Sequence, residues 1–242
     1  MTPLWTYPLP PVLEHWLKDA SPMRNLSSAG VRWNISDTGT ASIIIDHALL
    51  DSVTPRMLAW WMRFFCYQTV QISQQIIAPA FWLWHPQDHF VARITRHSLS
   101  GELGLVRGAH LTLTEKYGSH RPHTWDAKIV RATNRQRIIE LTSKQIYCGR
   151  LIENFHPHRF GMHIQSQLIF SHAGKASESQ LSNLFNTSFV QAWIKHKVEA
   201  IGNLATILPP IYAVQARRFF ATVNSQALDA TPSTWLRSIH SN

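Results

Sequence analysis

Apolar and polar positions alternate with a period of two through the middle of the chain. From Phe81 to Ser171, short polar turns separate strand-like stretches. The strands predicted there are Phe90–Arg96, Leu105–Lys116, Trp125–Arg131, Ile138–Tyr147 and Gly161–Ser171, and two earlier ones are Gly30–Asn34 and Thr38–Asp46. Strands that follow one another across short turns are typical of an antiparallel sheet, because parallel neighbours need a long crossover.

Apolar residues with helical spacing appear on either side of these strands. Thr54 is a good N-cap and Pro55 suits the first helical position. The apolar face of this helix is predicted to belong to the core and comprises Met57, Leu58, Trp61, Phe64, Phe65 and Gln68. A longer helix is predicted from about Asn186 to Leu208, where Pro209-Pro210 ends it, and a short one around Val12–Lys18.

This order of strands and helices predicts an α+β fold in which a curved antiparallel sheet grips the long C-terminal helix. We divide the chain into an irregular N-terminal extension (1–29), the main domain (30–212) and a C-terminal segment packed on that domain (213–242). A cavity between sheet and helix would be a natural ligand site.

Composition narrows the classes of partner. Hydrophobic residues make up 45% of the chain and charged residues only 15%, which supports a large buried core. The net charge of +9 is spread along the sequence without a basic run, so we predict no nucleic-acid partner. Cys66 and Cys148 lack metal-site spacing and are predicted to be reduced thiols. With no secretory signal or membrane-spanning stretch in the sequence, we expect a cytoplasmic protein with no membrane partner.

Three side chains that handle protons follow an uncharged stretch directly. Ile76–Trp84 carries no charge, and His85, Asp88 and His89 come immediately after it. Imidazoles and a carboxylate at the mouth of an apolar wall are typical of ligands, catalysts or a satisfied buried network. The alternative is that they are loop residues beside a core strand.

A second histidine–carboxylate pair lies on the C-terminal helix. His196 falls on the apolar face with Trp193 and Ala200, and Glu199 is three residues on, toward the flank. Side chains at this spacing can converge on one ion. The alternative is a solvated flank, since Lys195 and Lys197 would complete an ordinary charged surface.

Glu115 is in phase with the inward positions of its strand, Ala109, Leu111 and Leu113. A buried carboxylate needs a partner such as a metal, His or Arg, unless the strand ends before it. Together His85, Glu115, His196 and Glu199 offer two imidazoles and two carboxylates. This set suits zinc (Zn²⁺), with room for a water molecule.

Four stretches in this order resemble the family of 2,4-diacetylphloroglucinol hydrolase and phloretin hydrolase. They are Val53–Met62, Trp84–His89, Glu115 with Tyr117-Gly118, and His196–Tyr212. The resemblance implies a helix-grip (Bet v 1/START-like) fold, a zinc ion held by two His and two Glu, and hydrolysis of the C–C bond between an acyl group and a phenolic ring. It matches His85, Glu115 and His196 to ligands. Where the family often has a second glutamate, after Glu199, this chain has Ala200, and helix geometry points Ala200 into the core.

The leading hypothesis is therefore a zinc-dependent hydrolase of an acylated phenol. Asp88, His89 and His156 are our candidates for moving protons. The rival is a non-catalytic small-molecule-binding protein of the same fold with a degenerate metal site. Substrate identity and oligomeric state, with a homodimer among the alternatives, stay open.

Overall fold

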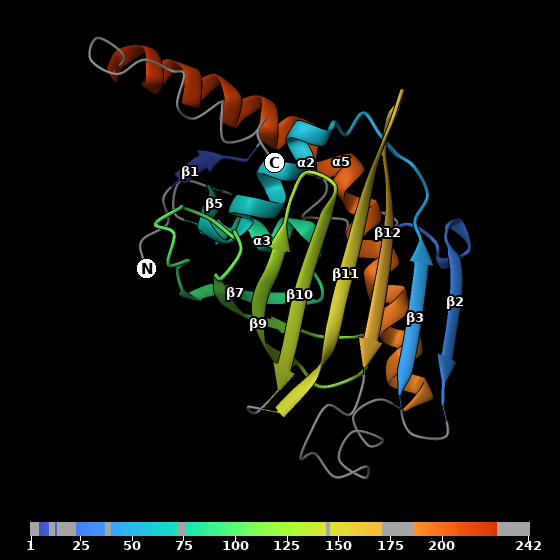
Figure 1. The fold of residues 1–242 in the computed structure, drawn as a ribbon. Coiled ribbons are helices and arrows are strands. Elements are labelled where there is room, and N and C mark those ends of the chain that lie inside the picture. Colours follow the sequence, from blue (N-terminus) through green and yellow to red (C-terminus); the bar gives the residue numbers. More distant parts are fainter. Residues whose placement is uncertain are drawn as a thin grey trace.

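The computed structural model has a large antiparallel sheet at its centre (Figure 1). It describes residues 5–9, 13, 23–36, 40–71, 76–143, 146–170 and 186–226. Within that part the sheet has nine strands, in the spatial order β2-β3-β12-β11-β10-β9-β8-β7, with β4 pairing with β12 beside this path. Their bounds are β2 (Gly30–Ile35), β3 (Ala41–Asp46), β4 (Leu50–Asp51), β7 (His89–Arg96), β8 (His110–Glu115), β9 (His123–Ala132), β10 (Gln136–Ser143), β11 (Ile146–His158) and β12 (Gly161–Phe170). The predicted α+β class and antiparallel pairing are confirmed.

The main departure within the sheet concerns β10 and β11. One strand was predicted over Ile138–Tyr147, but the chain forms a hairpin whose second strand continues to His158. Pro157 interrupts the sequence pattern without ending the strand, since His156 and His158 still pair with His163 and Gly161. The predicted strand over Leu105–Lys116 is also shorter than expected, because β8 begins only at His110.

A second, smaller sheet joins three segments in the order β1-β5-β6. β1 (Trp5–Pro8) pairs in parallel with β5 (Gln68–Gln71), and β5 pairs with β6 (Ile77–Pro79). The N-terminal extension is therefore not irregular throughout, because β1 within it pairs with β5. It also contains the short helix η2 (Leu26–Ser28), whereas most of the predicted helix around Val12–Lys18 lies outside the described residues.

Helix α2 (Pro55–Phe64) begins as predicted. The Thr54 hydroxyl accepts a hydrogen bond from the Met57 amide at 3.2 Å, the usual N-cap arrangement. The helix is shorter than its apolar pattern, because the chain tightens into η3 (Phe65–Tyr67) and Gln68 already belongs to β5. Pairing with the small sheet overrides the helical spacing there.

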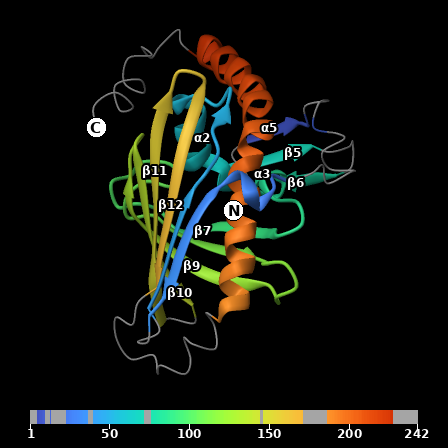
Figure 2. The ribbon, with the colours of Figure 1, turned by 90° about the vertical axis from the view of Figure 1, so that its right-hand side faces the viewer.

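Helix α5 (Thr187–Gln226) lies along the sheet and does not end at Pro209-Pro210. Neither proline has an N–H for the helical ladder, and the helix changes direction between its orange and red parts (Figures 1 and 2). Leu208 and Ile211, on either side, are fully buried, and this packing keeps the segment helical. The boundary drawn at 212 thus falls inside a helix, and residues 227–242 lie outside the described part. None of the helices described, α5 included, is both long and apolar enough to cross a membrane.

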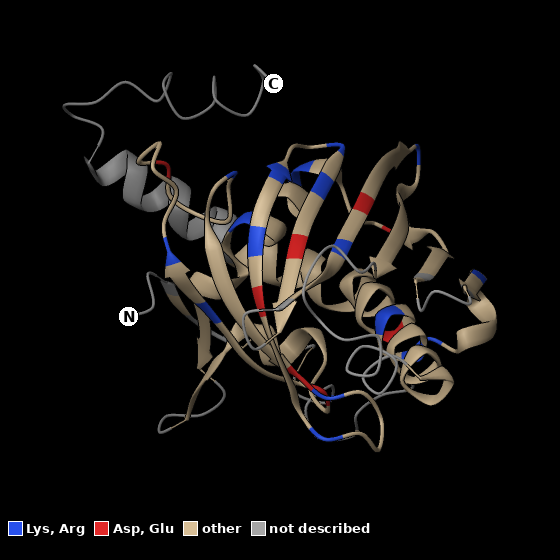
Figure 3. Cartoon of the chain, turned by 60° about the horizontal axis from the view of Figure 1, so that its bottom comes forward, with Lys and Arg blue, Asp and Glu red and all other residues tan. Residues whose placement is uncertain are grey.

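The core lies between the inner face of the sheet and α5. Fully buried side chains there include Ile43, Ile45, Ile129, Ile164 and Leu168 from the sheet and Ile201, Leu204 and Ile207 from the helix. Each contributes about 1.5–3 kcal/mol relative to exposure. Both cysteines are free thiols, as predicted. Figure 3 shows Lys and Arg spread over strands, loops and α5 instead of forming one stripe.

Candidate metal centre

A tight turn at the end of helix α3 (Ala80–Trp84) gathers the first group of polar side chains. The carbonyl of His85 accepts hydrogen bonds from the amides of Asp88 (3.2 Å) and His89 (2.9 Å). His89 is the first residue of β7. The turn therefore brings His85, Asp88 and His89 together at the junction of a helix and an edge strand.

Two hydrogen bonds hold this junction against α5. The indole N–H of Trp84 donates to the carbonyl of Ala200 at 2.7 Å, and the side-chain amide of Asn203 donates to the carbonyl of Trp84 at 3.0 Å. Ala200 is buried, as helix geometry predicts. This tie places His85 beside His196.

Three imidazoles form the centre of the site. The ring centroids of His85 and His196 are 4.7 Å apart, those of His89 and His196 are 5.1 Å apart, and those of His85 and His89 are 5.6 Å apart. All three are at most 4% exposed. Phe81 stacks on His89 at a centroid distance of 3.9 Å and fixes its plane.

Three carboxylates surround these rings. Asp88 Oδ2 lies 3.1 Å from His196 Nδ1 and 3.7 Å from His85 Nε2. Glu199 Oε2 lies 3.4 Å from His85 Nε2, and Glu115 Oε1 lies 3.4 Å from His89 Nε2. All four predicted ligands lie around these rings, but they do not form one ligand set, because Glu199 contacts His85 whereas Glu115 contacts His89.

The potential ligand atoms fall into two groups that share His196. One group is His89, Glu115 and His196, and the other is His85, Asp88 and His196; in each, the atoms lie within 4.8 Å of one another. Glu199 joins neither group and also contacts Lys195, with Nζ and Oε1 3.7 Å apart. Sequence reasoning placed His89 among the proton carriers, but its position is equally that of a ligand.

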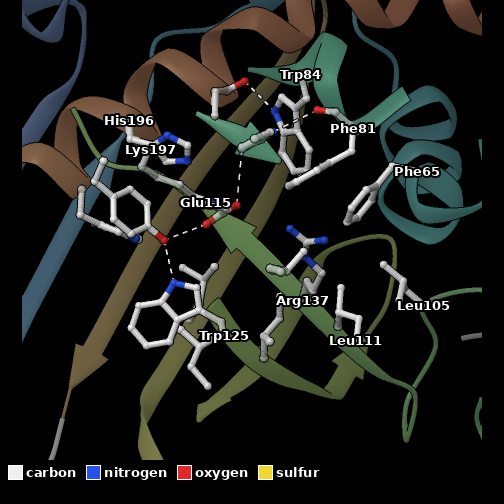
Figure 4. Close-up of a pocket in the computed structure, with 18 of the residues that line it drawn as sticks. Phe65, Phe81, Trp84, Leu105, Leu111, Glu115, Trp125, Arg137, His196 and Lys197 are labelled. Atoms are coloured by element: carbon white, nitrogen blue, oxygen red, sulfur yellow. Dashed lines mark hydrogen bonds and ion pairs between the residues drawn. The ribbon is translucent and has the colours of Figure 1, made fainter. Parts of the chain in front are cut away.

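The two groups face different spaces on either side of His196. His89, Glu115 and His196 line a narrow, mostly apolar cavity of about 60 Å³ between sheet and helix (Figure 4). Asp88, His196 and Glu199 line a polar hollow of about 120 Å³. An ion held by the first group would face the cavity, whereas an ion held by the second would face the hollow.

A chain of hydrogen bonds orients Glu115. The hydroxyl of Tyr117 donates to Glu115 Oε2 at 2.8 Å and accepts from the indole N–H of Trp125 at 2.7 Å. Burial and the nearby Glu115 carboxylate raise the pKa of Tyr117 well above its usual range, so its hydroxyl stays a donor at neutral pH. Such partners behind a ligand are typical of metal sites.

The protonation states suit a divalent cation. Burial, followed by the repulsion of neighbouring imidazoles, lowers the pKa of His89 and His196 well below the usual range, so both are neutral at pH 7. Burial raises the pKa of Asp88 and Glu115, a shift that a bound cation would oppose. His85 Nδ1 is buried without a hydrogen-bond partner in the described part of the chain. Neutral imidazole nitrogens and carboxylate oxygens are a donor set that fits zinc.

His156 does not reach the centre. It lies exposed on β11, next to the buried, inward-facing Phe155, and its ring centroid is 6.1 Å from that of His163. His156, a sequence candidate for moving protons, therefore points away from the centre, because the strand alternation that turns Phe155 inward turns His156 outward.

Sequence reasoning missed a buried ionic cluster beside the cavity. We call Arg137, Glu153 and Lys197 the Glu153 cluster. Lys197 Nζ donates to Glu153 Oε1 at 2.6 Å, and Arg137 Nε donates to Glu153 Oε2 at 2.7 Å. Glu153 lies between the inward residues Leu151 and Phe155, so the phase rule applied to Glu115 would have found it had β11 been recognised.

His47, which lies near the Glu153 cluster, should make the free energy of unfolding decrease as the pH is lowered. His47 Nε2 contacts the Ser166 hydroxyl at 3.0 Å, and burial, with repulsion by Lys197, lowers the His47 pKa to about 3. Between pH 6.5 and about 3, His47 is therefore protonated in the unfolded chain but neutral in the folded protein. We expect the unfolding free energy of metal-free protein to drop by about 1.4 kcal/mol per pH unit below 6.5 from this group. Urea unfolding of wild type and His47→Gln at several pH values measures it, and equal pH slopes in the two would contradict it.

Comparison with known proteins adds little to this picture. No protein-family model matches the chain, and no curated protein matches it either. Among solved structures, protein Ms6760 from Mycobacterium smegmatis is 13% identical, with 76% of this chain and 98% of that one covered and a TM-score of 0.44. NE0264 from Nitrosomonas europaea is 10% identical (71% and 96% covered, TM-score 0.43), as is CalU16 from Micromonospora echinospora (79% and 78%, 0.41). A likeness at this level carries no information on function.

Proposed function

We propose that this chain is a zinc-dependent hydrolase that cleaves the C–C bond between an acyl group and a phenolic ring. The observation that carries the proposal is a centre of buried, neutral imidazoles and carboxylates in the wall of an aromatic-lined cavity. Trp84, Trp125 and Trp193 offer flat walls for one aromatic ring. We also infer that the sheet and α5 form a fold of the helix-grip type.

Of the two ligand groups, the one on the cavity side suits this function better. His89, Glu115 and His196 would hold the ion where a substrate in the cavity can reach it, and Glu115 is already oriented by Tyr117. A bound zinc ion would supply Lewis acidity toward the ketone oxygen and toward a water molecule.

The other polar residues would position groups and move protons. Asp88 contacts His196 Nδ1 and so fixes the ring that both groups share. His85 Nε2 lies between Asp88 and Glu199, which line the outer hollow, and would pass protons between the centre and that hollow. Overall, one water molecule is consumed as the C–C bond breaks: its OH group joins the acyl carbon and its proton joins the ring carbon. The products are a carboxylic acid and a phenol.

The first test combines metal content with product release. Protein loaded with zinc should release a carboxylic acid from acylated phenols, chelator should stop this, and added zinc should restore it. Mass spectrometry measures the metal and chromatography the acid. Release that survives complete removal of metal, or no release from any acylated phenol by the zinc-loaded protein, would overturn the proposal.

The second candidate is a binding protein without catalysis, and Ala200 is the observation that favours it. This residue is buried in the core where the hydrolase family often has a second glutamate. A binding protein of this kind would hold an aromatic ligand with the same affinity before and after chelation.

A further inference from the structure

The Glu153 cluster carries more positive than negative charge. Two cations, Arg137 and Lys197, share the single carboxylate of Glu153, and the three side chains are at most 10% exposed. Burial alone would raise the pKa of Glu153, but the two cations outweigh it and hold the pKa at about 2, so the carboxylate is ionised. The cluster therefore keeps one net positive charge inside the protein. An excess buried charge is costly unless another group offsets it.

Among the described residues that line the same cavity, Glu115 carries the one carboxylate that could offset this charge. Its two oxygens, however, already face His89 and the Tyr117 hydroxyl. If the proposed zinc ion is bound there, its double charge exceeds the single charge of Glu115. The cavity would then be positive at both ends.

Both cations of the cluster line the cavity. In Figure 4 the guanidinium of Arg137 points into the space between Glu115 and Phe65. Glu153 uses one of the three N–H donors of the Lys197 ammonium group and, on Arg137, only the Nε and Nη2 nitrogens. As far as the described residues go, donors on both cations therefore remain for a ligand in this buried space, where a charged hydrogen bond is strong.

We propose that Arg137 and Lys197 form an anion subsite in this cavity, which binds an ionised oxygen on the ring of an aromatic ligand. The subsite also has a role in cleavage, and this role rests on the proposed function. Breaking the C–C bond leaves its electron pair on the ring, where hydroxyl oxygens share the negative charge until the ring carbon takes a proton. Donors fixed near those oxygens stabilise the charge as it develops. The substrate class is thus narrowed to acylphenols that enter as phenolates.

Binding to metal-free protein tests the subsite without turnover. The probes are 4-hydroxyacetophenone, at a pH where its hydroxyl is ionised, and its uncharged methyl ether, 4-methoxyacetophenone. Tryptophan fluorescence reports binding, because Trp84, Trp125 and Trp193 line the cavity. We expect wild type to bind the phenolate at least ~10-fold more tightly than the ether, about the value of one charged hydrogen bond.

Lys197→Met should reduce this ratio to near one while leaving the affinity for the ether unchanged. The substitution leaves Arg137 and Glu153 as a neutral pair, so the fold should survive, and circular dichroism checks this; Lys197→Gln replaces it if it does not fold. Lys128→Met is the matched control, since Lys128 is half-exposed and pairs with Glu140 on the sheet. Its ratio should stay that of wild type.

Equal affinity of wild type for the two probes would overturn the subsite, and so would a ratio that persists in Lys197→Met. Failure of the hydrolase proposal gives a different result. If the protein binds the phenolate more tightly than the ether but never releases a carboxylic acid, the anion subsite is supported and the hydrolase proposal fails.

Discussion

Zinc is expected to disappear from the protein when His196 is replaced by alanine. His196 is the one residue common to both ligand groups, and it lies buried between Asp88, His85 and His89. Loss of a supporting partner alone lowers metal affinity about 10–100-fold, so loss of this ligand should cost at least the upper end of that range. Mass spectrometry of purified His196→Ala should find near zero zinc where wild type carries about one ion per chain, with acid release lost as well.

Two further variants decide which group holds the ion. If the cavity-side group does, His89→Ala loses zinc and His85→Ala keeps most of it while slowing proton transfer; the reverse pattern would assign the ion to His85 and Asp88. His156→Ala is the control, because that histidine is exposed on β11. A folded His196→Ala protein that retains stoichiometric zinc would refute the metal centre.

Glu153→Gln is expected to destabilise the protein by about 3–5 kcal/mol, because it leaves two buried cations without their carboxylate. Arg137 and Lys197 both bind this one side chain, which is 0% exposed. Glutamine keeps the size and one acceptor but not the charge. Urea unfolding measures the change as a shift in midpoint at constant slope.

A matched control exists on the surface of the same sheet. Glu140 also has two cationic partners, Arg150 (2.8 Å) and Lys128 (3.7 Å), but its side chain is 23% exposed and those of its partners about half exposed. Glu140→Gln should therefore cost less than about 1 kcal/mol. If the two substitutions cost the same, burial does not govern the strength of the Glu153 cluster.

The features that were predicted correctly from the sequence depend on residues close to one another along the chain. The start of α2 was found because Thr54 and Pro55 act within one turn, and the inward phase of Glu115 and Ala200 follows from strand and helix periods. The predicted end of α5 at Pro209-Pro210 was wrong because Leu208 and Ile211 are fully buried in the core, and burial depends on the whole fold. No local pattern carries such information.

In the candidate centre, too, single residues could be found from local patterns, whereas most contacts between them could not. His85 and His196 were singled out separately, and their ring contact depends on Trp84 and Asn203 joining two helices across the core. His89 and Glu115 meet through the pairing of β7 with β8, which could be drawn from the hairpin order. Glu153 and Lys197 meet through a strand that was not recognised, so their cluster stayed hidden.

The ties between Trp84, Ala200 and Asn203 also bear on how a metal ion would arrive. Because backbone carbonyls and packed side chains hold α3 against α5, the imidazoles are brought together by folding itself. Small zinc domains, by contrast, gain their structure only when the ion binds. For the proposed centre we expect the reverse order: folding would assemble the ligands first, and an ion would then bind to the folded protein, or exchange for another, without unfolding it.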